Sequence, residues 1–447
     1  MKLSQFRFKL PEELIAQYPT RYREDARMLV LHRKTGEIEH KNVMDILQYF
    51  DEGDTFVFND TKVFPARLYA KKEKTNANIE VFLIRELNHA NRYWDVLVDP
   101  ARKIRIGNKL YFDDDPMIVA EVIDNTTARG RTFRFLTDYD QDDFIKKLYA
   151  LGSTPLPKYI QRPMSEEVQA RYDEEFGGQP VEEMDVERYQ TVFAKHIGAV
   201  AVPAACLHFS KQLLKRMEIQ GFELTYITSH MSLGNFKAID VEDLTKSKSD
   251  SEQIIISQQA VDTITRAQDK GHRVCAVGTE IMRAMEHVAG TGGRIKTYDG
   301  WTNKFIYPPY EFAAANAFFT NFYLPQALEA PPHVVGAGER RGAFDRYVVA
   351  VVDRHEPVEL HGPGEAARLV RNPLLHVAVA AEDPRPAADA GLLRGEREAD
   401  AHREALPERA RSHLHARHEP ALGMPRAARA VLAEALQLVH RERAGAG

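Results

Sequence analysis

Two histidines and a Gly-Thr pair occupy positions where acid–base chemistry is expected. His208 follows an apolar run, His230 follows a segment rich in β-branched and aromatic residues, and Gly278-Thr279 follows a further apolar segment. Imidazole gains and loses a proton close to neutral pH, so it suits a general base. A purely structural role is the commoner alternative for a single histidine, and the residue types alone leave both interpretations open.

The surrounding elements predict how these residues are positioned. A strand is predicted at Ala199–Val202, a helix at Ser210–Gln220 and a strand at Phe222–Ile227. A helical crossover makes two such strands parallel, so their carboxyl ends share one edge of the sheet. Both histidines and Gly278-Thr279 are therefore expected at that edge, where ligands bind in open α/β sheets. A buried strand at Thr55–Phe58 ends in three polar residues, Asn59, Asp60 and Thr61, for which a turn or cap is the structural alternative.

Between Pro65 and Tyr149 the pattern changes to short strands without helices. Six strands are predicted, at residues 66–70, 79–84, 94–98, 109–112, 117–123 and 132–136. Strands joined only by turns favour a small antiparallel barrel, which leaves no open sheet edge. The predicted fold class is therefore α/β, with a large α/β domain of parallel strands and an inserted six-stranded antiparallel β-barrel domain.

Composition divides the chain further and limits its class. The predicted domains are 1–64, the first part of an α/β catalytic domain; 65–150, the barrel; 151–325, the second part of the α/β domain; and 326–447, an atypical tail. The tail has no Lys and no Ile and is rich in Ala, Arg and Pro, which predicts disorder or a shifted reading frame. The net charge of −5 argues against binding nucleic acid by bulk charge. With two cysteines and no long apolar run, we expect a cytoplasmic chain without disulfides or a membrane span.

A series of short motifs stands in order along residues 1–325. They are Phe58 to Val63, Trp94 to Val98, Pro155 to Pro157, Arg188 to Val192, Leu207 to Phe209, Val277 to Thr279 and Gly300 to Thr302. Together these motifs resemble the S-adenosylmethionine:tRNA ribosyltransferase-isomerase family of queuosine biosynthesis.

The resemblance implies an activity and its substrates. Members of that family transfer the ribosyl group of S-adenosylmethionine to 7-aminomethyl-7-deazaguanine at the wobble position of tRNA with a GUN anticodon. The group is isomerised to an epoxycyclopentanediol, which gives epoxyqueuosine-tRNA and releases adenine and methionine. The resemblance implies no metal and no separate cofactor, because S-adenosylmethionine is a co-substrate. We also expect a monomer.

The same resemblance suggests roles for particular residues. His208 and His230 are the candidates for the base that removes a proton from the ribose carbon beside the sulfonium. The predicted substrate-binding residues are Asn59, Asp60, Thr61, Arg188, Tyr189, Gln190, Phe209, Gly234, Gly278, Thr279, Arg283, Trp301 and Tyr307. Among them, Phe209, Trp301 or Tyr307 would hold the sulfonium by cation–π attraction. Arg188 and Tyr189 could instead form a salt-bridged helix face, and Trp301 could fill the core.

Some residues depart from the family pattern, and other functions stay open. Cys206 and Ser232 stand where glycine is usual, Glu280 stands where a small hydroxyl residue is usual, and Tyr323 stands where histidine is usual. A catalytically impaired, RNA-binding relative is therefore the alternative function. An ordinary methyltransferase is disfavoured because the Gly-rich nucleotide loop is missing. Which residue is the base, which face binds tRNA and whether the tail folds are left open. Basic clusters such as Arg102-Lys103-Arg105 are more often solvated surface than a track for tRNA.

Overall fold

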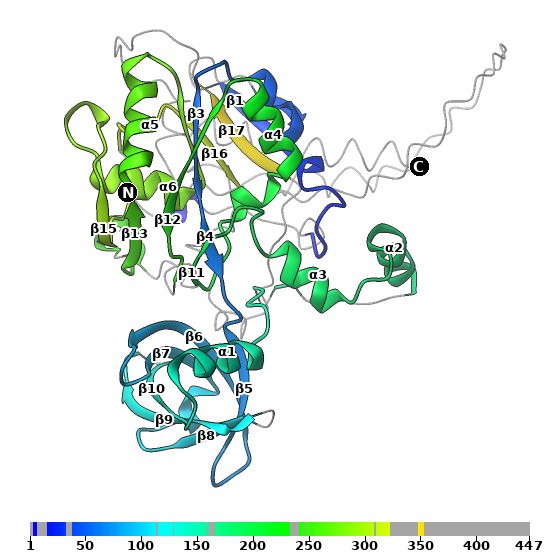
Figure 1. The fold of residues 1–447 in the computed structure, drawn as a ribbon, viewed down its shortest axis with the longest axis vertical. Helices are drawn as coiled ribbons and strands as arrows, with labels where there is room; N and C mark the ends of the chain where they lie inside the picture. The colour runs from blue at the N-terminus through cyan, green and yellow to red at the C-terminus, as the bar shows by residue number, and fades with distance from the viewer. Residues whose placement is uncertain are drawn as a thin grey trace, which may run out of the picture.

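The fold comes from a computed structural model and combines a large mixed sheet with a separate closed barrel (Figure 1). The structure describes residues 3–6, 16–32, 38–112, 115–127, 129–157, 159–160, 166–232, 241–247, 249–307, 310–321 and 347–352. Short 3-10 helices connect many of the elements. They are η1 (Leu3–Phe6), η3 (Arg23–Asp25), η4 (Val43–Gln48), η5 (Ala101–Lys103), η6 (Ala204–His208), η8 (Leu244–Lys246) and η9 (Thr291–Gly293).

The barrel is built from six consecutive antiparallel strands. They are β5 (Arg67–Lys72), β6 (Asn78–Asn88), β7 (Tyr93–Asp99), β8 (Lys109–Phe112), β9 (Asp115–Asn125) and β10 (Gly130–Leu136). Strand order β10-β7-β6-β5-β8-β9 closes on itself. In β7, alternate residues Trp94, Val96 and Val98 are buried inside the barrel. Helix α1 (Gln141–Leu151) adds Phe144 and Leu148 to the same core. The predicted six-stranded barrel is confirmed.

The large sheet has nine strands in the order β15-β13-β12-β3-β14-β16-β17-β1-β2. Their bounds are β1 (Arg27–His32), β2 (Ile38–Asn42), β3 (Thr55–Asn59), β12 (Glu223–Ser229), β13 (Glu252–Ile256), β14 (Val274–Val277), β15 (Tyr298–Thr302), β16 (Ala317–Asn321) and β17 (Tyr347–Val352). The four neighbours β12, β3, β14 and β16 are parallel, whereas β13 and β15 continue the sheet antiparallel. This confirms the predicted α/β class with parallel strands.

Helices cover the two faces of this sheet. They are α4 (Lys211–Ile219), α5 (Gln258–Asp269) and α6 (Thr279–Val288). Two further helices, α2 (Glu166–Phe176) and α3 (Val181–Arg188), lie in the connection between α1 and β11. Alternation along β3 sends Phe56 and Phe58 into the core shared with α4, and Val57 into the core shared with α5 and α6. Ser210 and Ser257 cap α4 and α5 by accepting a hydrogen bond from a backbone N–H of the first turn.

The predicted crossover before α4 is wrong. Strand β11 covers His196–Ala199, earlier than the predicted Ala199–Val202, and it pairs in parallel with β4 (Thr61–Val63) in a two-stranded sheet of its own. The apolar run Ala199–Val202 is buried all the same, because it packs into the core that includes the barrel. This buried apolar run was mistaken for a central strand of the large sheet. Its backbone instead belongs to the segment that connects the barrel and the large sheet.

One strand of the large sheet comes from the atypical tail. Strand β17 lies between β16 and β1, antiparallel to the former and parallel to the latter. Disorder or a shifted reading frame was predicted for this region, and residues 347–352 differ from the prediction of disorder because they form a strand. The rest of the predicted tail, residues 326–346 and 353–447, lies outside the described residues, as does Tyr323.

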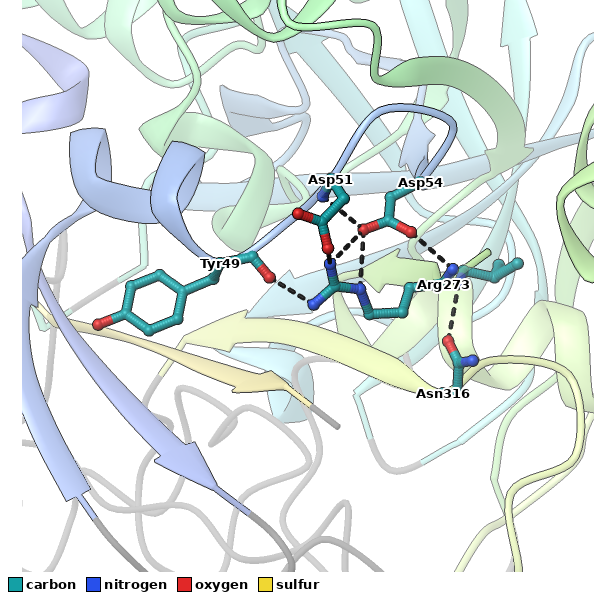
Figure 2. A network of polar contacts seen from close by, with 6 residues as sticks. Tyr49, Asp51, Asp54, Arg273 and Asn316 are labelled. Atoms are coloured by element: carbon teal, nitrogen blue, oxygen red, sulfur yellow. Dashed lines mark hydrogen bonds and ion pairs between the residues drawn. The ribbon is translucent and has the colours of Figure 1, made fainter. Parts of the chain in front are cut away.

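A buried ionic network fixes the amino-terminal edge of the large sheet (Figure 2). The guanidinium of Arg273 contacts Asp54 Oδ2 at 2.7 Å and also pairs with Asp51, while Asp54 Oδ1 accepts the backbone N–H of Arg273 at 2.7 Å. Arg273 is 2% exposed and Asp54 0%. Because Asp54 precedes β3 and Arg273 precedes β14, the network sets the register of the two central strands.

Candidate active site

Polar residues follow the carboxyl ends of the parallel strands, in the order of the strands across the sheet. His230 follows β12, Asp60 follows β3, Gly278 follows β14, and Asn321 ends β16. Since these strands are parallel neighbours, their carboxyl ends form one continuous edge. The two-stranded sheet β4–β11 begins from this same edge and leads toward the barrel (Figure 1).

His230 is held tightly at this edge. Its Nδ1 atom lies 2.7 Å from the hydroxyl oxygen of Thr61, and its backbone N–H donates to the carbonyl of Gln253 at 2.9 Å. The imidazole also covers Gly198, where an added Cβ would stand 2.7 Å from three ring atoms. Burial lowers the pKa of His230, the nearby His196 lowers it further, and Asp60 opposes the shift. A neutral imidazole in a fixed orientation is suited to accept a proton.

Asn59 braces the edge and is not available to a substrate. Its side-chain amide donates to the carbonyl of Ser229 at 3.0 Å, and its oxygen accepts the backbone N–H groups of Ser229 at 3.0 Å and Thr61 at 3.1 Å. Asn59 is 0% exposed. It therefore joins the ends of β3 and β12 and presents Thr61 to His230, a structural outcome for a residue that the sequence analysis placed among the substrate contacts.

Asp60 brings a third histidine to the site. Its carboxylate accepts the hydroxyl of Thr228 at 2.6 Å and lies 3.6 Å from Nε2 of His196, whose side chain is 47% exposed. His196 opens β11, and its backbone N–H donates to the carbonyl of Asp60 at 3.2 Å. His196 was not among the predicted site residues, because the strand was predicted at Ala199–Val202, after this residue. A strand predicted to begin near Ile197 would have placed the neighbouring His196 at the start of that strand and so marked it as a candidate.

Gly278 and Thr279 form a sharp turn from β14 into α6. Gly278 has φ 98°, a left-handed conformation that favours glycine, and an added Cβ would stand 2.3 Å from a carboxylate oxygen of Glu280. Glu280 is 4% exposed, and burial raises its pKa to about 7 although hydrogen bonds with Asn59 and Thr279 oppose the shift. The carboxyl group thus lies under the middle of the polar edge, beside Asn59.

His208 lies in a different part of the edge from His230. It ends η6 and is 6% exposed, and its Nε2 lies 2.9 Å from Oδ1 of Asn321. Burial lowers its pKa to about 4, against the hydrogen bonds to Asn321 and to the backbone of Arg23. Since β3 and β14 stand between β12 and β16, the structure separates the two histidines that were expected to share one site. Of the two, His230 has the surroundings of a base.

Arg188, Tyr189 and Gln190 make contacts within the protein. The guanidinium of Arg188 donates to the carbonyls of Thr20 at 2.7 Å and Arg21 at 3.0 Å. Tyr189 is buried in the core that includes the barrel. The side-chain amide of Gln190 pairs with both backbone groups of Val63, at 3.1 Å each. These residues hold β4 and the N-terminal segment against the connection that contains α3.

The aromatic residues expected to hold a sulfonium differ in their access. Phe209 is fully buried against Phe58 and Phe319, at 4.8 and 5.0 Å between ring centroids, so it has no face for a ligand. Trp301 is 47% exposed, but Arg85 of the barrel strand β6 already lies 5.1 Å from its ring centroid. Tyr307 packs with Phe305 at 5.7 Å. The expected cation–π role of Phe209 is therefore not supported.

The remaining predicted residues flank His230. Arg283, one turn into α6, pairs with the buried Glu252 and donates to the hydroxyl of Ser249 at 3.1 Å. Glu252 also accepts the backbone N–H of Ser232 at 3.1 Å. Gly234 lies outside the described residues.

The two replacements of a usual glycine are accommodated without backbone strain. Within the described residues, Asn76 and Arg92 are the non-glycine residues with a positive φ, so Cys206 and Ser232 both have ordinary backbone angles. Cys206 is buried, with its sulfur 3.8 Å from the carbonyl oxygen of Val277. Across the described part of the chain, no His, Cys, Asp and Glu side chains group as metal ligands, and no described helix is long and apolar enough to cross a membrane.

Comparison with known proteins identifies the family. The model of the queuosine biosynthesis protein family matches residues 3–349. The S-adenosylmethionine:tRNA ribosyltransferase-isomerase of Bacteroides fragilis is 62% identical over 325 residues, which are 73% of this chain and 88% of that protein. The protein of the same name from Phocaeicola vulgatus is 59% identical over an equal share. The protein of that name from Amoebophilus asiaticus is 50% identical over 355 residues, 79% of this chain and 97% of that protein. The chain therefore belongs to the queuosine biosynthesis protein family, whose members include S-adenosylmethionine:tRNA ribosyltransferase-isomerases.

Proposed function

We propose that the chain transfers the ribosyl group of S-adenosylmethionine to 7-aminomethyl-7-deazaguanine at the wobble position of tRNA with a GUN anticodon. The ribosyl group is isomerised to an epoxycyclopentanediol, and adenine and methionine are released. The observation that supports this function best is the presence at the carboxyl edge of two histidines with polar partners, His230 at 2.7 Å from Thr61 and His196 at 3.6 Å from Asp60. They supply two imidazoles to a reaction that moves several protons.

The proton balance of the reaction requires both a base and an acid. One proton leaves the ribose carbon beside the sulfonium and one leaves the attacking amine, whereas departing adenine gains one. The net result is one proton released to solvent. The sulfur keeps the electron pair of its broken bond to carbon and leaves as the neutral thioether of methionine.

His230 is the base in this proposal. Its lowered pKa keeps the ring neutral near pH 7. A base needs a free lone pair, so Nδ1–H donates to the hydroxyl oxygen of Thr61, and Nε2 accepts the proton from carbon. In this tautomer the hydroxyl of Thr61 accepts the hydrogen bond, and Gly198 leaves room for the ring.

His196 is the matching acid. Its Nε2 lies 3.6 Å from the carboxylate of Asp60, and its side chain is 47% exposed and so can reach a substrate. In this role it protonates adenine as the glycosidic bond breaks. In this proposal the two histidines divide the tasks, because His230 takes a proton from the ribose carbon and His196 gives one to adenine.

The test is release of adenine. The full chain is incubated with S-adenosylmethionine and with tRNA that carries 7-aminomethyl-7-deazaguanine, and adenine is measured by chromatography. We expect release that depends on the modified base. Replacing the base, His230→Gln, should lower kcat by about 10² to 10⁴-fold. The matched control is His272→Gln, at the amino-terminal edge of the same sheet, which should leave kcat unchanged.

Two results would contradict the proposal. A folded chain that binds the modified tRNA and releases no adenine would match the alternative of a non-catalytic RNA-binding relative. Wild-type turnover in the His230→Gln variant would exclude His230 as the base while leaving the activity in place. Because both proposed substrates are cytoplasmic, we propose that the chain acts in the cytoplasm, as a monomer and without a separate cofactor.

A further inference from the structure

Two basic segments that are distant in sequence meet at one end of the barrel. The amino group of Lys72, at the end of β5, donates to the carbonyl of Lys103 at 2.7 Å. Nearby, the backbone N–H of Glu73 donates to the carbonyl of Lys109 at 3.0 Å. These contacts bring the turn between β5 and β6 against the loop between β7 and β8. We call the exposed cations of this turn and loop, Lys74, Arg102, Lys103 and Arg105, the far-end basic surface.

This surface lies at the end of the barrel that is remote from the large sheet. The chain enters the barrel from β4, so the first residue of β5 is near the large sheet and the last is at the opposite end. A strand of this length spans about 17 Å. In Figure 1 the barrel lies below β4, and β5 runs from the end nearest β4 to the far end of the barrel. The far-end basic surface therefore has no part in the candidate active site.

The loop that carries three of the cations is held rigidly. Arg131, which is 6% exposed, donates to the carbonyls of Ala101 at 2.8 Å, Ile104 at 2.9 Å and Gly130 at 2.7 Å. The side-chain oxygen of Asn108 accepts the backbone N–H of Arg105 at 3.0 Å. A buried guanidinium thus satisfies backbone carbonyls of the loop, and the loop backbone that carries the exposed cations is held in place.

The exposed cations are not neutralised within the described part of the protein. Of the ion pairs between described residues, none includes Lys74, Arg102, Lys103 or Arg105. The carboxylate of Glu73, the neighbour of Lys74 in sequence, accepts the hydroxyl of Tyr111 at 3.2 Å. The chain as a whole has a net charge of −5, so a polyanion would be attracted only by such a local concentration of positive charge.

Two exposed aromatic side chains lie on the outside of the barrel, on strands β5 and β8, which adjoin the loops of the far-end basic surface. Tyr69 is 63% exposed and Tyr111 is 36% exposed. Tyr69 lies on the outer face of β5, and Tyr111 of β8 is the cross-strand partner of Lys71 on the same face. Exposed aromatic rings next to lysine and arginine are typical of surfaces that contact RNA.

We propose that the far-end basic surface binds the phosphate backbone of the tRNA substrate, at nucleotides outside the wobble position. This inference rests on the proposed function, which places the wobble base at the carboxyl edge of the large sheet. The cations are spread over two loops and point outward, which suits a chain of phosphates better than one small anion. The barrel would then position the tRNA while the large domain carries out the chemistry.

The test compares two charge-reversal variants of the full chain. Arg102→Glu with Arg105→Glu alters the far-end basic surface, and Lys211→Glu with Lys215→Glu on α4 makes the same change of charge on the large domain. Binding of full-length tRNA is measured by fluorescence anisotropy over a series of salt concentrations. We expect the barrel variant to weaken binding about tenfold or more and to reduce the salt slope by about 2, and the α4 variant to match wild type.

Independent readouts separate this inference from the proposed function. The barrel variant should raise KM for tRNA, with kcat, KM for S-adenosylmethionine and the thermal unfolding midpoint unchanged. Wild-type affinity and salt slope in a folded barrel variant would overturn the inference, as would equal losses in both variants, which indicate bulk charge alone. Failure of the wild-type chain to release adenine would refute the proposed function and leave the binding comparison valid.

Discussion

The hydroxyl of Thr61 lies 2.7 Å from Nδ1 of His230 and joins two strands that are far apart in sequence. Thr61 opens β4, which leads to the barrel, and His230 follows β12 of the large sheet. Asn59 fixes both partners, since its side chain bonds the backbone of Thr61 and of Ser229. The orientation of the imidazole is therefore set by the same contacts that attach the barrel to the sheet.

Replacing the hydroxyl of Thr61 should reduce turnover without changing the fold. In Thr61→Val the imidazole loses a hydrogen bond worth about 1 kcal/mol, so we expect kcat to fall roughly five- to tenfold. Thr61→Ser keeps the hydroxyl and serves as the control, with kcat close to that of wild type. Single-turnover release of adenine measures both variants. Equal rates for the valine and serine variants would show that this bond does not orient the base.

The free energy of unfolding should rise as pH increases from about 4 to 6.5, and the burial of His208 contributes to this rise. Burial lowers its pKa from 6.5 to about 4, so between these values the unfolded chain binds the extra proton and the native chain does not. The free energy of unfolding should therefore fall by about 3 kcal/mol as pH drops from 6.5 to 4. His208→Gln should remove this contribution. Urea unfolding at pH 4.5 and 7 measures it, and an unchanged slope in the variant would contradict it.

Glu280 should have the opposite effect on stability. Burial raises its pKa from 4.5 to about 7, so the native chain binds the extra proton between these values and stability falls as pH rises. At pH 8 the buried carboxylate costs about 3 kcal/mol. Glu280→Gln should therefore be more stable than wild type at pH 8, with little difference at pH 4. The comparison uses urea midpoints at both pH values. A variant that is less stable at pH 8 would show that the carboxylate is needed.

The buried network of Asp54 and Arg273 should dominate the stability of the amino-terminal edge. Asp54→Asn leaves a guanidinium that is 2% exposed with Asp51 as its remaining carboxylate partner. We expect a loss of about 3 kcal/mol in the free energy of unfolding. The matched control is Asp269→Asn, which breaks the exposed pair with Arg294 and should cost less than about 1 kcal/mol. Similar losses in the two variants would mean that burial of the network contributes nothing.

The barrel could be predicted from the sequence because its signal is local. Strand β7 alternates buried and partly exposed residues, and turns separate strands of which most neighbours in sequence also pair with one another. The carboxyl edge could be predicted in part for a related reason. His230 and Gly278-Thr279 directly follow strands that the pattern of β-branched residues had identified.

The features that the sequence did not reveal depend on contacts between distant segments. Ala199–Val202 is as apolar as a central strand, but its burial comes from the core that includes the barrel. His196 was missed for the same reason, since β11 pairs with a strand more than a hundred residues earlier. His208 was expected beside His230, and only the pairing order of β12, β3, β14 and β16 shows how far apart they are.

The position of β17 between β16 and β1 has a consequence for how the chain is made. All six barrel strands are complete once residue 136 has been synthesised, so the barrel can close early. The large sheet joins β1, near the start of the chain, to β16 only through residues 347–352. During translation, more than three hundred residues must therefore be made after β2 before β17 can join β1 and β2 to β16. Until then the edge of β1 is unpaired, and a chaperone or a neighbouring nascent chain could bind it.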